Sequence, residues 1–122
     1  MKVPFMDLAT QYRDLETQIL PAMQNICERA QFILGEDVEL FEREFAAFCE
    51  AEFAIGVDSG TSALELILRA LGIGQGDEII TTANTFIATA LSISSTGAKP
   101  VFVDIDPDTH TIDVNSIEEA VT

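Results

Sequence analysis

The sequence predicts an α/β fold, a parallel sheet with flanking helices, and three observations predict it. From residue 53 onward, short apolar runs typical of buried strands alternate with helical segments. Glycine and proline separate these segments at short intervals. Before residue 53 the apolar periodicity is helical throughout. We therefore expect a helical segment over 1–52 and an incomplete α/β domain over 53–122, with parallel strands joined by helical crossovers.

Two helices are predicted in the N-terminal segment. Apolar residues recur at steps of three and four from Leu8 to Ile26, and Pro21 inside this pattern is expected to kink or split the first helix. Gly35 interrupts the chain, and the acidic residues after it favour the start of a second helix. The apolar face of this second helix is predicted to contain Val38, Phe41, Phe45 and Phe48.

Strands and helices alternate after residue 52. Asn115 and Glu118 form a predicted capping pair for a last helix. Three strands with so few helices would leave much apolar surface uncovered, so we expect the opening part of a larger domain. In chain order, the predicted strands and the helices between them are 53–57, 63–71, 78–82, 85–93 and 100–104.

Composition and charge exclude several classes of function. The chain has 122 residues, of which 48% are hydrophobic, which is enough for a core in one domain at most. Its 21 acidic and 6 basic residues give a net charge of −15, which argues against nucleic-acid binding and against a polybasic membrane patch. No apolar run approaches the ~20 residues of a membrane span, and Asp7 comes too early for a signal peptide. We therefore expect a cytoplasmic protein.

Neither a metal site nor a cysteine or histidine catalyst is predicted. Cys27 and Cys49 have no metal-binding spacing and lie near the apolar helix faces, so we expect inert core thiols. His110, the only histidine, lies in a polar loop and is expected to be exposed. Asp104 and Asp106 follow a predicted strand, but two carboxylates without a third ligand are better explained as solvated loop acids.

A glycine-rich run at 72–76 does not predict a dinucleotide site. A glycine loop that binds phosphates must follow a strand and begin a helix. This run follows a predicted helix and precedes a predicted strand, where a helix C-cap and a turn require glycine. We interpret these glycines as structural.

The turn formed by Ser59, Gly60 and Thr61 is the first candidate for binding chemistry. It follows an apolar run and precedes an apolar helix, so free backbone N–H groups and the positive end of the helix dipole are expected there. Hydroxyl groups add further donors, a combination suited to a phosphate monoester. An ordinary serine or threonine helix cap explains the same residues.

Phe86 is the second candidate. It comes shortly after a predicted strand, and ligands bind open α/β sheets at the carboxyl ends of their strands. Its ring could lie against a planar ring of a ligand held by the Ser59–Thr61 turn. A core aromatic residue in an apolar helix is the alternative interpretation.

Taken together, six ordered motifs resemble the start of the DegT/DnrJ-type (StrS-like) pyridoxal-phosphate-dependent aminotransferases, which act on nucleotide-linked keto-sugars. The resemblance spans essentially the whole chain. The motifs are Val3–Leu8 with Gln11 and Tyr12, Gln31–Gly35, Ser59–Leu64, Gly74–Ile80, Asn84–Thr89 and Gly97–Asp104.

The resemblance implies a cofactor, a fold and a reaction. Ser59, Gly60 and Thr61 would hold the 5′-phosphate of pyridoxal 5′-phosphate, and Phe86 would stack on its pyridine ring. The fold would be the N-terminal part of the large domain of a fold-type I transferase, normally a homodimer with active sites at the subunit interface. The family reaction moves an amino group, usually from glutamate, to a ketone of a nucleotide sugar, with the pyridine ring as electron sink.

The sequence lacks the family's catalytic residues. The lysine that forms the aldimine, and the acid that pairs with the pyridine nitrogen, would both lie beyond residue 122, so no catalytic residue is assigned here. Lys2 and Lys99 are the only lysines, and neither is placed to substitute. The resemblance therefore implies an N-terminal fragment that is inactive alone.

Two alternatives remain open. Some relatives use the same cofactor for sugar dehydration, with histidine in place of the lysine, and that position lies outside these residues. A non-enzymatic phosphate-binding α/β module would instead fold cooperatively as a monomer, whereas a fragment would expose apolar surface. The sequence does not identify the sugar, the position aminated or the amino donor.

Overall fold

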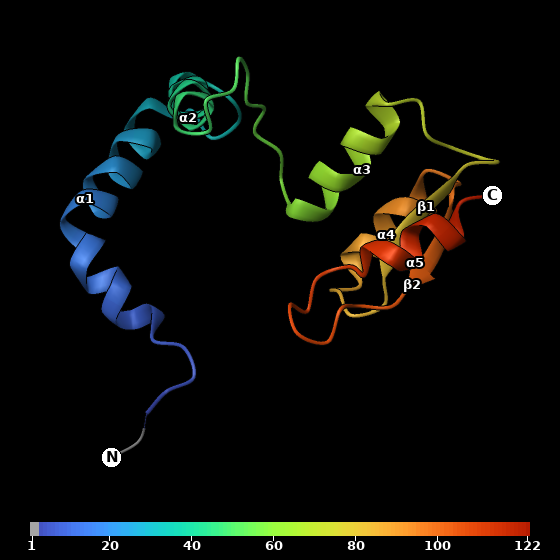
Figure 1. The fold of residues 1–122 in the computed structure, drawn as a ribbon. Coiled ribbons are helices and arrows are strands. Elements are labelled where there is room, and N and C mark those ends of the chain that lie inside the picture. Colours follow the sequence, from blue (N-terminus) through green and yellow to red (C-terminus); the bar gives the residue numbers. More distant parts are fainter. Residues whose placement is uncertain (1–2) are drawn as a thin grey trace. The chain divides into compact units, whose positions relative to one another are not determined.

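A computed structural model describes residues 3–122, which divide into two compact units between Gly56 and Val57. Figure 1 shows the elements in chain order. Among the described residues, no helix is long and apolar enough to cross a membrane. The first unit contains α1 (Leu8–Arg29) and α2 (Glu36–Phe48), and the second contains α3 (Gly60–Ala70), β1 (Glu78–Thr82), α4 (Ala88–Ser95), β2 (Lys99–Val103) and α5 (Val114–Ala120).

The first unit confirms both predicted helices. Asp7 caps α1 by accepting a hydrogen bond from the Thr10 N–H at 3.1 Å. Pro21 lies inside α1 without splitting it, and Figure 1 shows that the helix is bent instead. Arg29 at the end of α1 forms ion pairs with Glu36 and Asp37 at the start of α2. These ion pairs therefore connect the end of α1 to the start of α2.

The apolar face predicted for α2 is present but uncovered. The ring of Phe45 lies 5.5 Å from that of Phe41 and 6.3 Å from that of Phe48, measured between centroids. All three side chains are exposed. The prediction that Cys27 and Cys49 are core thiols is wrong, because both are exposed in the part of the chain that the structure describes.

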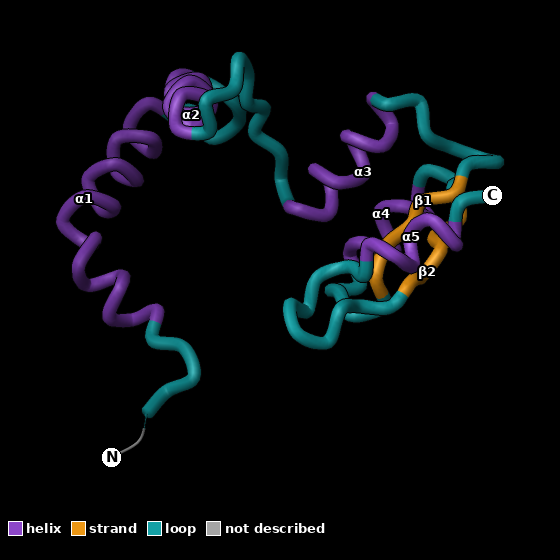
Figure 2. The backbone as a smooth tube through the Cα atoms, in the orientation of Figure 1, coloured by secondary structure: helices purple, strands orange, loops and turns teal. Residues whose placement is uncertain are grey.

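The second unit confirms the α/β class, with two parallel strands rather than three. β1 and β2 pair in register from Glu78 opposite Lys99 to Thr82 opposite Val103. α4 connects the two strands and contacts both, α3 packs on α4, and α5 packs on β2. Figure 2 shows these strands side by side among the helices of this unit. Ser92 and Ile93 of α4 are each 2% exposed, so α4 lies at the centre of the small core.

The strand predicted at 53–57 is wrong. These residues form no strand and pair with neither β1 nor β2, which make a two-stranded sheet with each other. Instead, the Gly56 N–H donates to the Glu42 Oε1 of α2 at 2.7 Å. An apolar run predicts burial, but a strand also needs a neighbouring strand with which to form backbone hydrogen bonds. Among the described residues, no strand pairs with residues 53–57.

The remaining elements differ from prediction mainly at their ends. Helix α4 begins at Ala88, three residues later than predicted, and α3 begins at Gly60, three residues earlier. The predicted Asn115–Glu118 capping pair is wrong. Asp113 caps α5 instead, and its Oδ1 accepts from the Asn115 N–H at 3.0 Å.

Acid is expected to weaken the second unit through specific carboxylates. The ammonium group of Lys99, 2.6 Å from Glu78, lowers the pKa of that carboxyl group, and backbone N–H donors lower the pKa of Asp106 and of Asp113. Because each pKa is lower in the folded state, the stabilisation is present above the unfolded-state pKa and is lost as pH falls through the folded one, below roughly pH 4.

Acid also reduces the general charge repulsion within a chain whose net charge is −15. A pair of variants separates the effect of the specific carboxylates from this general one. Melting followed by circular dichroism should show Glu78→Gln less stable than wild type near pH 7 and equal to it near pH 3. Glu119→Gln is the control, since Glu119 forms no ion pair or hydrogen bond through its side chain with residues 3–122. A constant Glu78→Gln difference across pH would contradict the prediction.

Candidate cofactor-binding site

The α3 turn, defined as Ser59, Gly60 and Thr61, has the geometry of a capped helix start. Ser59 is extended (φ −159°, ψ 160°), and its Oγ accepts from the Ser62 N–H at 3.1 Å. The Ala63 N–H donates to the Ser59 carbonyl at 3.0 Å. No acceptor within residues 3–122 meets the N–H groups of Gly60 and Thr61. The helix cap predicted from sequence is therefore present, and it leaves two N–H donors for a ligand.

Gly60 is not required by the conformation or packing of the described chain. Its φ lies outside the left-handed region that favours glycine. A Cβ at this position would meet no atom of the described residues within 4 Å. A glycine that its own chain does not need is typical of a place where a ligand approaches the backbone closely. The α3 turn therefore fits a phosphate group, which binds free N–H groups at a helix start.

Phe86 lies outside the helix that was expected to contain it. It belongs to the α4 entry loop, residues 83–87, and the residue is 77% exposed. The Phe86 carbonyl accepts from the Thr89 N–H at 3.0 Å, and the hydroxyls of Thr85 and Thr89 lie 3.0 Å apart. The core-aromatic interpretation is therefore wrong for the described chain, while the loop around the exposed ring is held by hydrogen bonds.

The α3 turn and the α4 entry loop lie at the same end of the second unit. The C-terminal ends of α3 and α4 meet, because Arg69 Nη2 donates to the Ser95 carbonyl at 2.9 Å. Residues from both helices also line one hollow of about 180 Å³ beside β1. The helices thus run side by side in the same direction, as Figure 1 shows, and their N-terminal ends lie together.

This end of the unit is the carboxyl edge of the sheet. β1 and β2 are parallel, so the connecting helix α4 returns against them and begins near the end of β1. The structure thus brings Phe86 to the carboxyl edge predicted from sequence. Lys99 begins β2 and is therefore at the opposite edge, where it pairs with Glu78 at 2.6 Å.

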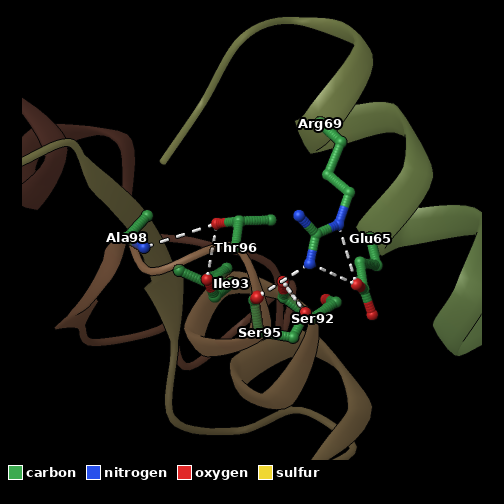
Figure 3. A network of polar contacts seen from close by, with 7 residues as sticks. All are labelled: Glu65, Arg69, Ser92, Ile93, Ser95, Thr96 and Ala98. Carbon is green, nitrogen blue, oxygen red and sulfur yellow. Dashed lines mark hydrogen bonds and ion pairs between the residues drawn. The ribbon is translucent and has the colours of Figure 1, made fainter. Parts of the chain in front are cut away.

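A network of polar contacts joins α3 to α4 at the end opposite the α3 turn (Figure 3). Arg69 Nε donates to Glu65 Oε1 at 2.9 Å, while Nη2 of the same side chain reaches the Ser95 carbonyl. The hydrogen bond from Arg69 lowers the pKa of Glu65. The role of Arg69 is not predictable from the sequence, where only its spacing of four residues from Glu65 is visible.

Other candidates have structural roles. The glycine run at 72–76 follows α3 and precedes β1, as predicted, and Gly72 and Gly76 have φ of 76° and 100°. The Asp106 carboxylate accepts hydrogen bonds from the N–H groups of Asp108 and Thr109 within its own turn. His110 is exposed in this loop, as predicted.

The chain is similar to proteins that are about three times as long. It is 48% identical, over all of its 122 residues and 33% of the relative, to "Pleiotropic regulatory protein" of Geobacillus stearothermophilus. It is 45% identical over 121 residues, 99% of the chain and 32% of the relative, to dTDP-3-amino-3,4,6-trideoxy-alpha-D-glucose transaminase of Streptomyces venezuelae. The chain thus spans about a third of the length of these relatives.

A solved structure agrees with these sequence relatives. The crystal structure of NtdA from Bacillus subtilis, with bound cofactor PMP, matches with a TM-score of 0.94 and 36% identity. The match covers 99% of this chain and 28% of that one. In addition, the sequence profile of the DegT/DnrJ/EryC1/StrS aminotransferase family matches residues 13–122. The chain therefore belongs to the DegT/DnrJ/EryC1/StrS aminotransferase family.

Proposed function

We propose that this chain forms the part of a pyridoxal-phosphate-dependent nucleotide-sugar aminotransferase that holds the cofactor. The observation that carries the proposal is the α3 turn. Two N–H groups that have no acceptor among residues 3–122 lie there, beside a glycine that the described chain does not require. An exposed phenylalanine lies at the same end of the unit. A phosphate joined to a flat aromatic ring matches both features.

Each residue has a separate role in this proposal. The N–H groups of Gly60 and Thr61 bind the phosphate, with the hydroxyls of Ser59 and Thr61 as further donors. The ring of Phe86 lies against the pyridine ring and shields it from water. When bound, pyridoxal 5′-phosphate supplies the electron sink that amino transfer requires.

We extend the proposal to the substrate and to the assembly. One relative is named for a transaminase product carried on dTDP, which supports a nucleotide-linked keto-sugar as amino acceptor, and we propose glutamate as the donor. We also propose that residues 53–122 belong to a larger cofactor-binding domain and that the complete enzyme is a homodimer. The many exposed apolar side chains support a larger assembly, because isolated domains seldom leave so much apolar surface in water.

The test is binding of pyridoxine 5′-phosphate, which has no aldehyde and so cannot react with Lys2 or Lys99. By isothermal titration calorimetry, the chain should bind this compound more tightly than inorganic phosphate and should not bind pyridoxine. Phe86→Ala should lower affinity for pyridoxine 5′-phosphate about 2- to 10-fold, which is the loss of affinity expected when one aromatic contact is removed. It should leave the affinity for inorganic phosphate unchanged.

Phe102→Ala is the matched control, since Phe102 is also an exposed phenylalanine of this unit but lies in β2. Equal affinity of wild-type chain for phosphate and pyridoxine 5′-phosphate would contradict the role of Phe86. If the wild-type chain binds neither compound, the proposed site as a whole is contradicted.

A further inference from the structure

The C-terminal end of α4 is capped in part by a residue from another helix. The last carbonyl groups of a helix have no partner within it. Three of these carbonyl groups accept hydrogen bonds from donors close in sequence. Ser95 Oγ donates to Ser92 O at 2.9 Å, Thr96 Oγ1 donates to Ile93 O at 2.8 Å, and the Gly97 N–H donates to Ser94 O at 3.0 Å. The fourth, the Ser95 carbonyl, accepts from Arg69 Nη2 at 2.9 Å, 26 residues away in sequence.

Arg69 is itself held in place. Glu65, one turn earlier on α3, accepts from Arg69 Nε at 2.9 Å and lies 2.8 Å from Nη2. The guanidinium group is planar, so fixing one of its edges orients the remaining N–H groups. We call Arg69, Glu65 and the Ser95 carbonyl the Arg69 clamp (Figure 3).

The apolar contact between α3 and α4 does not fix their alignment by itself. A hollow of about 180 Å³ lies beside their contact, lined by Leu64, Ile67 and Leu68 of α3, by Ile79, Ile80 and Thr81 of β1 and by Thr89, Ser92 and Ile93 of α4. Leucine and isoleucine beside a hollow can change rotamer as the helices slide, since apolar contacts have little directionality. A directed hydrogen bond resists such sliding, because a shift of the helices would lengthen it.

The clamp and the proposed cofactor site lie at opposite ends of the same two helices. Gly60 is nine residues before Arg69, about 13 Å along α3, and Ala88 is seven residues before Ser95, about 10 Å along α4. Helices of this length act as stiff rods. A hydrogen bond at one end therefore limits how far the α3 turn and the α4 entry loop can shift along each other at the other end.

We propose that Arg69 is a positioning residue that aligns the phosphate-binding α3 turn with the ring of Phe86. This inference rests on the proposed function, because it assigns Arg69 a role in holding the same cofactor. Arg69 touches neither the phosphate nor the ring. It acts by aligning the helix that binds one with the helix that follows the other.

The test compares a ligand that needs one helix with a ligand that needs both. Inorganic phosphate needs only the α3 turn, while pyridoxine 5′-phosphate needs the turn and Phe86 together. Arg69→Gln should lower affinity for pyridoxine 5′-phosphate about 2- to 10-fold, as Phe86→Ala does, and leave the affinity for phosphate unchanged. Arg69→Lys, which can still donate to the Ser95 carbonyl, should restore part of the loss.

A double-variant cycle separates positioning from general stability. If Arg69 acts through Phe86, the variant with both Arg69→Gln and Phe86→Ala should bind no more weakly than Phe86→Ala alone. Arg43→Gln is the matched control, because Arg43 makes no side-chain hydrogen bond or ion pair with the residues that the structure describes. Far-ultraviolet circular dichroism checks that α3 and α4 remain helical, and Glu65→Gln provides a milder change if Arg69→Gln unfolds.

Three results would overturn the inference. Additive losses in the double variant would mean that Arg69 acts independently of Phe86. An equal loss for both ligands would mean that it supports only the α3 turn. If the wild-type chain binds phosphate but gains nothing from the pyridine ring, there is no alignment for Arg69 to set, whereas binding of neither ligand overturns the proposed function along with it.

Discussion

Gly60→Pro is expected to weaken phosphate-monoester binding about 10- to 100-fold, the value of one hydrogen bond to a charged group, while leaving α3 helical. Proline has no N–H, so the substitution removes one of the two free donors of the α3 turn. Wild-type chain and variant would be compared by isothermal titration with inorganic phosphate and pyridoxine 5′-phosphate. Both ligands should lose affinity by the same factor, because both use the same donor.

The helix itself should tolerate this proline. Gly60 is the first residue of α3, the helical position at which proline is most favourable, and its N–H has no acceptor to lose. The residue before a proline must be extended, and Ser59 already is, with ψ of 160°. The melting temperature should therefore stay the same or rise slightly.

Gly60→Ala distinguishes the effect of the N–H donor from the effect of the open space beside Gly60. Alanine keeps the N–H and adds a Cβ that meets nothing within 4 Å in the chain. Any loss of affinity in this variant therefore measures contact with the ligand. Retained phosphate affinity in Gly60→Pro would mean that the phosphate is bound elsewhere.

The local turn chemistry of the site could be predicted from sequence. Ser59 before an apolar helical run predicts a capped start, and β1 was predicted with the bounds that the structure has. Both depend on a few neighbouring residues. The sequence pattern also placed Phe86 near the end of β1.

Long-range contacts could not be predicted in the same way. The run at 53–57 has strand composition but lacks a pairing partner, so Gly56 bonds to a side chain of α2 instead. The hydrogen bond from Arg69 to Ser95 spans 26 residues and depends on how two helices pack. From local sequence Phe86 is better suited to a helix interior, because composition does not specify the residue at which α4 begins.

These 122 residues are also expected to catalyse no amino transfer, since the family reaction needs a lysine at the cofactor to move protons. Lys2 and Lys99 are the only lysines. Lys99 begins β2, at the edge of the sheet opposite Phe86, and its ammonium group lies 2.6 Å from Glu78. Lys2 lies outside the described residues.

The measurement is 2-oxoglutarate formed from glutamate with pyridoxal 5′-phosphate, compared with the same mixture without protein. Free cofactor transaminates slowly by itself, so only a rate above that background counts. Wild-type chain and Lys99→Arg should both match the background, because arginine keeps the ion pair with Glu78 but cannot replace a catalytic lysine. A rate above background that Lys99→Arg abolishes would place Lys99 at the cofactor. The ring would then lie at the amino edge of the strands rather than beside Phe86, and the site proposed at the α3 turn would be wrong together with the expected inactivity.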